Sequence, residues 1–195
     1  MAKQSKTPGN NLAKEILYPT LSLLLICLVS AAALALVNAV TKERIAEHDR
    51  AAADTARQEI FPTAIFEEKA DGLFCEAYDV DGTLLGYLVD GEAQGYGGPI
   101  RVAVGLDTQG LVVKVVVLDC EGETPGLGQK VKEESFLRQF EGVHAFFWIS
   151  KAQTSSKISI DAVAGATYSS QGVVDAVNRA IQIYNEQIYA GGEAG

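Results

Sequence analysis

Hydrophobic and polar residues follow three different patterns along the chain, and the first predicts a membrane helix. Residues 16–41 contain no charged side chain, and this run exceeds the ~20 apolar residues that a helix needs to cross a bilayer. Residues 42–60 are rich in Ala, Glu, Arg and Gln and favour continued helix up to Pro62. The pattern therefore predicts one spanning helix that continues without a break into a stalk.

The second pattern consists of short apolar runs separated by turn sequences, which is typical of strands. Turns are indicated by Asp-Gly at 81–82 and Asp-Thr-Gln-Gly at 107–110. Four strands are expected between residues 73 and 118, namely 73–78, 84–89, 100–106 and 111–118. The third of these strands alternates large apolar residues with small or polar ones, so it should bury one face. Residues 111–118 are apolar almost throughout and are expected to be central in the sheet.

The third pattern is helical and begins after an alternating, strand-like segment at residues 157–160. Ser169 or Ser170 is expected to cap the first turn of this helix. Thr167 lies just ahead of the helix N-terminus, where free N–H groups and the helix dipole favour a phosphate. Gly165 and Ala166 are small enough for a phosphate to approach the backbone. These residues alone are compatible with an anion site or with an ordinary helix start.

Several shorter segments fit structural roles. Gly-Tyr-Gly-Gly at 95–98 is followed by Pro99 and a strand, which favours a tight bend or bulge rather than a phosphate-binding loop. A short helical run is expected around Phe136, Leu137 and Phe140. The aromatic residues at 146–148 alternate between strand faces, so core packing is preferred to a stacking platform.

Composition and charge limit the classes of partner. The chain has 195 residues, of which 48% are hydrophobic, and a net charge of −9, so a packed core is available and nucleic acid is not an expected partner. Cys27, Cys75 and Cys120 are isolated in sequence, and no metal site is predicted from them. Cys75 and Cys120 could pair in an oxidising compartment or stay as two buried thiols.

Positive charge before the apolar run sets the expected topology. Lys14 lies at its N-terminal end and Lys3 and Lys6 precede it, which favours a cytoplasmic N-terminus, an external C-terminal part and the lipid bilayer as a partner. The length of the apolar run argues against a signal peptide cleaved near 33–35. The bulky Ile26 argues against a lipoprotein signal that ends at Cys27. The expected organisation is a cytoplasmic tail at 1–15, a transmembrane helix at 16–41, a helical stalk at 42–62, a domain at 63–190 and a tail at 191–195.

Two motifs resemble those of one protein family. The sequence Asp-Ala-Val-Ala-Gly-Ala-Thr at 161–167 resembles the Ser-Gly-Ala-Thr signature of the covalent FMN-binding domain. That domain occurs in the G subunit of Rnf electron-transport complexes and in the C subunit of sodium-pumping NADH:quinone reductases. Ala164 stands where the family usually has Ser. The sequence Glu-Thr-Pro-Gly-Leu-Gly at 123–128 resembles a second loop of the same domain, and the family also has a Gly-Tyr-Gly-type segment before a strand.

The resemblance implies a single α+β FMN-binding domain with an antiparallel-rich sheet and packed helices. It implies that Thr167 carries FMN through a phosphoester made by a dedicated flavin transferase, with Gly165, Ala166 and Ser169 nearby. The second loop is expected against the flavin ring, with Glu123, Thr124 and Leu127 as candidate contacts. No catalytic residue and no metal ligand is assigned.

The resemblance also implies a function. The chain would be an electron-carrying subunit of an Rnf-type complex, which couples electron transfer between ferredoxin and NAD to translocation of Na⁺ or H⁺. Its partners would be the other subunits, and its location the cytoplasmic membrane of a bacterium or archaeon. Activity as an oxidoreductase and translocase belongs to the complex and stays open for the isolated chain. The alternatives are the C subunit of a sodium-pumping NADH:quinone reductase, or an anchored sensor or binding module that lacks flavin.

Overall fold

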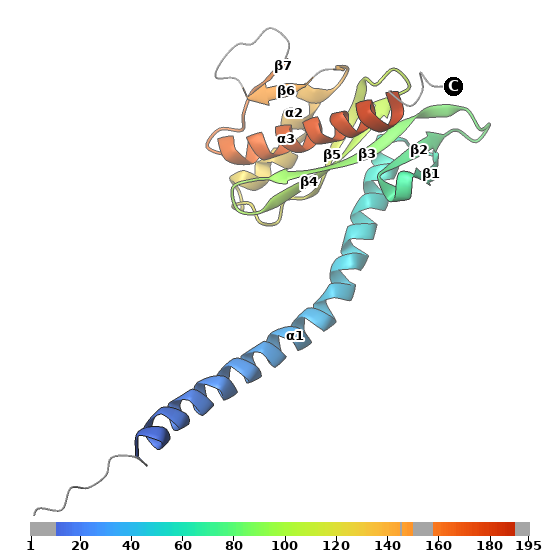
Figure 1. The fold of residues 1–195 in the computed structure, drawn as a ribbon. Coiled ribbons are helices and arrows are strands. Elements are labelled where there is room, and N and C mark those ends of the chain that lie inside the picture. The colour runs from blue at the N-terminus through green and yellow to red at the C-terminus, as the bar shows by residue number, and fades with distance from the viewer. Residues whose placement is uncertain (1–10, 145, 150–157, 190–195) are drawn as a thin grey trace, which may run out of the picture. The chain divides into compact units, whose positions relative to one another are not determined.

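The computed structural model describes residues 11–144, 146–149 and 158–189 (Figure 1). The chain divides into two compact units, Met1–His48 and Asp49–Gly195. One helix, α1 (Asn11–Ile60), contributes to both units. The five-stranded sheet lies entirely in the second unit.

The first unit is the apolar part of α1. Within the described part of the chain, α1 is the one helix long and apolar enough to cross a membrane. Its hydroxyl side chains bond back to the helix: Thr20 Oγ1 donates to the Ile16 carbonyl at 2.7 Å and Ser22 Oγ to the Pro19 carbonyl at 3.0 Å. Such internal bonds remove the cost of presenting a free hydroxyl to lipid. The predicted unbroken helix to Ile60 is confirmed.

The second unit is built on a five-stranded antiparallel sheet in the order β1-β2-β3-β4-β5. The strands are β1 (Ile65–Lys69), β2 (Phe74–Tyr78), β3 (Leu84–Gln94), β4 (Pro99–Asp107) and β5 (Val112–Asp119). The four predicted strands are confirmed, although β3 runs five residues past its expected end. The unpredicted strand β1 has two apolar residues followed by three charged ones, and its side chains are largely exposed, so it lacks the apolar alternation of a half-buried strand.

The remaining elements lie around this sheet (Figure 1). They are the one-turn helices η1 (Ala70–Gly72), η2 (Gly128–Lys132), α2 (Glu134–Leu137) and η3 (Arg138–Phe140), the parallel pair β6 (Phe147–Ile149) and β7 (Ile158–Ile160), the long helix α3 (Thr167–Tyr184) and the π-helical turn η4 (Asn185–Tyr189). The α+β class is confirmed.

Helix α3 covers one face of the sheet (Figure 1). The large apolar residues of β4 on this face, Ile100, Val102, Val104 and Leu106, are fully buried, as their alternation predicted. The close approach of α3 to β3 depends on glycine, because a Cβ on Gly91 of β3 would overlap the Ala176 carbonyl oxygen of α3. Backbone therefore packs directly against backbone.

The end of α1 covers the other face. Ala56, Ile60 and Phe61 pack with buried residues of the sheet, and a Cβ on Gly105 would overlap the Ile60 side chain. Ala56 and Ile60 are 0% and 5% exposed, so this end of α1 is part of the core of the second unit. Both sheet faces are covered, which explains why β4 buries small residues such as Ala103 between its larger ones.

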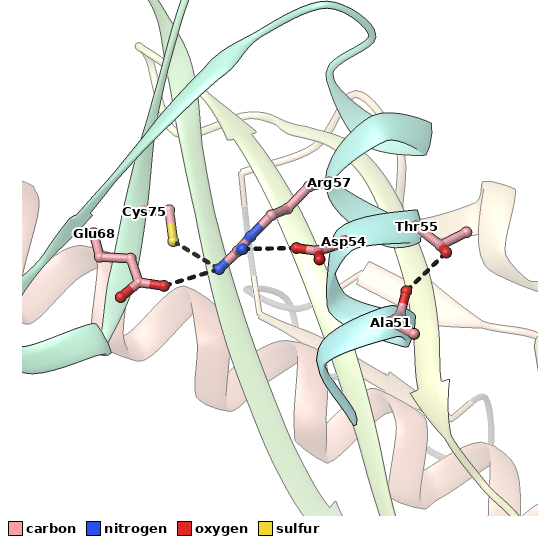
Figure 2. Close-up of polar contacts among 6 residues, drawn as sticks. All are labelled: Ala51, Asp54, Thr55, Arg57, Glu68 and Cys75. Carbon is pink, nitrogen blue, oxygen red and sulfur yellow. Dashed lines mark hydrogen bonds and ion pairs between the residues drawn. The ribbon is translucent and has the colours of Figure 1, made fainter. Parts of the chain in front are cut away.

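Charged side chains surround this second contact (Figure 2). Arg57 of α1 donates from Nη1 to Asp54 Oδ1 at 3.0 Å and from Nη2 to Glu68 Oε1 at 3.2 Å, and Nη2 lies 3.6 Å from Cys75 Sγ. Burial raises the pKa of the Cys75 thiol, and the Arg57 guanidinium offsets part of that rise. Cys75 and Cys120 are both buried and unpaired.

The expectation that residues 111–118 form a central strand is wrong, because β5 is at the edge of the sheet. Its apolar sequence has a different cause. Val112 and Val115 are buried in the core beneath α3, whereas Val116 and Leu118 pack against the α1 side. The strand edge is partly covered at its start, where Val112 exchanges backbone hydrogen bonds with Gly142 and Val143.

Core packing of the aromatic segment is confirmed for Phe147 but not for Phe146, which is 40% exposed. Phe147 is fully buried, and its ring packs edge-on against that of Phe140 with 4.9 Å between the ring centroids. Asn178 of α3 accepts from the Phe147 N–H at 2.8 Å and donates to its carbonyl at 2.9 Å. The side chain of Trp148 lies outside the described part of the chain. The short helical run is also confirmed, with Phe136 and Leu137 buried.

Candidate cofactor site

Three segments distant in sequence meet at a cavity of about 340 Å³ at the N-terminal end of α3. They are the β3–β4 hairpin loop, the loop after β5 and the turn into α3. The cavity is lined by Tyr96, Thr124, Leu127, Gly128, Gly165, Ala166, Thr167, Tyr168 and Ser169. Its volume lies at the lower end of the ~300–1,000 Å³ that is usual for ligand pockets. Six of the seven predicted site residues line it, and the seventh, Glu123, lies behind the wall.

The turn into α3 has the features of an anion site. The helix begins at Thr167 after Ala166, and no side chain caps it. The first N–H groups of a helix have no acceptor within the helix, and the helix dipole adds partial positive charge there. Gly165 adopts φ +78°, a left-handed conformation that suits glycine. None of the nine lining residues is charged, so an anion would be held by backbone and hydroxyl groups.

The predicted serine cap is wrong, because both serines lie inside the helix and bond elsewhere. Ser170 Oγ accepts from the Val163 N–H at 3.0 Å and is fully buried. Ser169 Oγ donates to Glu123 Oε2 at 2.5 Å and is also buried. Thr167 is exposed. Of the three residues with an aliphatic hydroxyl in this turn, Thr167 is therefore the exposed one.

The loop after β5 provides the facing wall. The Thr124 carbonyl accepts from the N–H groups of Leu127 and Gln129, both at 3.2 Å, which folds the loop into a compact turn. Leu127 is 41% exposed, and a Cβ on Gly165 would lie 3.0 Å from Leu127 Cδ1. The two loops that the sequence motifs singled out are thus in direct contact at the cavity.

Two tyrosines at the cavity were not predicted as site residues. Tyr96 and Tyr168 are 71% and 76% exposed, and their ring centroids lie 6.4 Å apart at an angle of 44°. Tyr96 is in the two-residue hairpin turn, where the Gly95 N–H donates to the Gly98 carbonyl at 2.8 Å, which confirms the expected tight bend. Tyr96 lies within the Gly-Tyr-Gly-Gly segment at 95–98, and Tyr168 directly follows the motif at 161–167. This proximity is the sequence signal that could have placed them at the site.

These features fit a flavin mononucleotide. Backbone N–H groups and a hydroxyl at a helix start suit its phosphate, whereas Leu127 and the two tyrosines present apolar and aromatic surface to a planar ring. The absence of an acidic lining residue among those described also suits an anionic ligand.

Comparison with known proteins gives the class. The FMN-binding domain family matches residues 95–182, and the RnfG N-terminal region family matches residues 6–60. Among solved structures, NqrC of Shewanella oneidensis is similar over 70% of this chain and 74% of that one, with 19% identity and a TM-score of 0.48. The two family matches define an FMN-binding domain that follows an apolar N-terminal helix.

Curated relatives give the particular family. The G subunit of the Na(+)-translocating ferredoxin:NAD(+) oxidoreductase complex of Acetobacterium woodii is 33% identical over 84% of this chain and 89% of that protein. The G subunit of the ion-translocating oxidoreductase complex of Methanosarcina acetivorans is 28% identical over 90% of this chain and 97% of that protein. The chain belongs to the RnfG family of subunits of Rnf-type membrane complexes. This membership favours an RnfG-type subunit over both alternatives drawn from the sequence.

Proposed function

We propose that the chain is a membrane-anchored electron carrier whose FMN is attached to Thr167, and that it works as a subunit of an Rnf-type complex. In that complex, electron transfer between ferredoxin and NAD is coupled to translocation of Na⁺ or H⁺. The observation that carries the attachment site is the exposed position of Thr167 at the uncapped start of α3. Family membership supports the complex and its reaction.

Attachment requires an activated phosphate and an accessible nucleophile. We propose that a flavin transferase presents a phosphoanhydride of FMN to Thr167. The Oγ1–P bond then forms as the anhydride P–O bond breaks, the second phosphate leaves, and the hydroxyl proton passes to a base of the transferase. Ser169 and Ser170 would not compete, because both hydroxyls are buried and hydrogen-bonded.

The other cavity residues would bind and orient the flavin. The N–H groups at the start of α3 would hold the phosphoryl oxygens. Leu127, Tyr96 and Tyr168 would contact the ring, and the exposed Thr124 side chain could hydrogen-bond to it. Bound FMN supplies the capacity to take up and release one or two electrons. The protein's part is attachment, orientation and adjustment of the potential, with donor and acceptor provided by other subunits.

The proposed topology follows from the apolar helix and the lysines before it. Residues 1–15 would be cytoplasmic and residues 16–41 would span the cytoplasmic membrane. The helical stalk at 42–62, the domain at 63–190 and the tail at 191–195 would be external. The unbroken helix α1 supports a direct connection between anchor and domain.

Replacement of the attachment hydroxyl tests the proposal. The full chain, produced together with the flavin transferase, should show flavin fluorescence at its own mass on a denaturing gel. Thr167→Ala should remove this signal, whereas Thr124→Ala, which alters an exposed threonine of the same cavity, should keep it. Loss of one exposed hydroxyl changes the free energy of unfolding by under ~0.5 kcal/mol, so the variant should stay folded.

Thr167→Ser keeps the oxygen and should retain part of the label. A complex assembled with Thr167→Ala should keep its subunits and lose ferredoxin–NAD electron transfer. Covalent flavin on the Thr167→Ala chain, or a dark wild-type band, would contradict the attachment site. Full coupled activity of the Thr167→Ala complex would contradict the proposed role of this flavin.

A further inference from the structure

Glu123 is a buried carboxylate placed between the three segments that form the cavity. It is 1% exposed, which is rare for a glutamate. Burial of a carboxylate is costly unless hydrogen bonds replace its hydration. Both oxygens have such bonds: Oε1 accepts from the Gly97 N–H at 3.1 Å, and Oε2 accepts from Ser169 Oγ at 2.5 Å.

The room for this carboxylate is made by glycines from two of the three segments. A Cβ on Gly95 would overlap Glu123 Oε1, and a Cβ on Gly128 would lie 2.8 Å from Oε2 and 2.9 Å from Ser169 Oγ. In addition, Gly97 and Gly122 approach so closely that a Cβ on Gly97 would overlap the Gly122 carbonyl oxygen. The absence of a Cβ at these positions therefore leaves the space that the Glu123 side chain occupies.

Each bond of Glu123 ends next to a residue that lines the cavity. Gly97 follows Tyr96 in the hairpin, Ser169 lies two residues after Thr167 in α3, and Glu123 itself precedes Thr124. The partners are 26 and 46 residues away in sequence. A single carboxylate thus connects the ring-side loops to the phosphate-side helix.

We propose that Glu123 is a positioning residue that sets the spacing between the phosphate-side and ring-side walls of the cavity and keeps the Ser169 hydroxyl turned away from it. The effect on flavin rests on the proposed function, but the spacing itself is a property of the chain alone. Glu123 acts through Gly97 and Ser169, with no contact to the ring. It differs in this from Thr124 and Leu127, which line the cavity.

Three substitutions at position 123 separate the effect of side-chain length from the effect of side-chain charge. Glu123→Gln keeps the length of the side chain, its amide oxygen can accept from Gly97, and its amide N–H can donate to Ser169 Oγ, which also accepts. Glu123→Asp keeps the charge but is one methylene shorter and cannot reach both partners. Glu123→Ala removes both bonds. Glu121→Ala, an exposed glutamate in the same loop, is the matched control.

The first readout needs no flavin. In the full-length Thr167→Ala chain, amide hydrogen exchange of residues 95–98 and 167–170 should become about tenfold faster in the Ala and Asp variants, since loss of a buried hydrogen bond shifts a local opening equilibrium by roughly that factor. The Glu123→Gln variant and the Glu121→Ala control should show the same exchange rates as the Thr167→Ala chain without a further substitution. Unchanged exchange in the Ala and Asp variants would overturn the proposal, whatever becomes of the flavin site.

The second readout uses the flavinylated chain with Thr167 intact. The Ala and Asp variants should shift the midpoint potential and the visible circular dichroism of the flavin, and the Gln variant should restore both. Ser169→Ala, which removes one partner, should change them in the same direction as Glu123→Ala. A flavin with wild-type potential and dichroism in the Asp and Ser169→Ala variants would show that Glu123 is merely structural. If Glu123→Ala does not accumulate, the Asp, Gln and Ser169→Ala chains still decide between these outcomes.

Discussion

Gly91→Ala should loosen the contact between α3 and the sheet and thereby disturb the helix that carries Thr167. Gly91 is in β3, and the Cβ of an alanine would overlap the Ala176 carbonyl oxygen and lie 2.9 Å from its carbonyl carbon. Both are backbone atoms of α3, so no side-chain rotation can relieve the overlap. Either the helix moves away from β3 or the strand bends.

The expected magnitude follows from two opposing effects. Overpacking of this kind costs about 1–3 kcal/mol, whereas alanine gains about 0.5–1 kcal/mol over glycine in a strand because it loses less backbone entropy. The net loss in the free energy of unfolding should be about 0.5–2 kcal/mol, which corresponds to a Tm lower by about 2–8 °C for a domain of this size.

Gly98→Ala is the matched control, because a Cβ there would meet Gly122 Cα at 3.4 Å, an ordinary contact. Thermal unfolding of the full chains in detergent, followed by near-ultraviolet circular dichroism, should show a lower Tm for Gly91→Ala and a nearly unchanged one for Gly98→Ala. Flavin attachment to the Gly91 variant should also slow, since Ala176 lies in the same helix as Thr167. Equal unfolding temperatures for Gly91→Ala and the wild type would refute the backbone contact.

Two further predictions concern pH and topology. Burial raises the pKa of the Cys75 and Cys120 thiols, so the folded state keeps protons that the unfolded chain loses. The free energy of unfolding should be unaffected below the unfolded thiol pKa of about 8.5. It should fall as the pH rises from there to the raised pKa of the folded state, by up to about 1.4 kcal/mol per pH unit for each thiol. Urea unfolding at several pH values should show a shallower fall in the double Cys→Ala variant, and equal slopes would contradict this reasoning. For topology, a protease added outside intact spheroplasts should digest the domain and spare residues 1–41; a protected domain would contradict the orientation, and a mature chain that lacks residues 1–30 would contradict the anchor.

The elements of this protein could largely be predicted from sequence, since periodicity depends on neighbours within a few residues. The charge-free run at 16–41, the alternation in β4 and the one-sided apolar face of α3 each specify an element locally. Position in the sheet is different. The apolar sequence of β5 suggested a central strand, yet β5 is at the edge, because burial of both faces does not require a neighbour on both sides.

The two motifs could likewise be found in the sequence, because each is a short continuous string of residues, at 123–128 and 161–167. What the strings did not specify is the direction of each side chain. Glu123 was expected to contact the flavin ring, and the structure places it behind the cavity wall, bonded to Gly97 and Ser169. Ser169 or Ser170 was expected to cap the helix, and the two side chains instead bond to Glu123 and Val163.

The sequence by itself thus determined the apolar anchor, most elements of the α+β domain and the threonine at the start of α3. Only the tertiary structure decided which loops share the cavity and that Tyr96 lies opposite Tyr168. It also decided that one buried carboxylate, that of Glu123, connects the cavity loops. These contacts join residues that are tens of positions apart, and they form only when the sheet brings the loops together. A local sequence pattern does not predict which distant loops come into contact. The entropy of closing a loop depends weakly on its length and not on the residues at its ends.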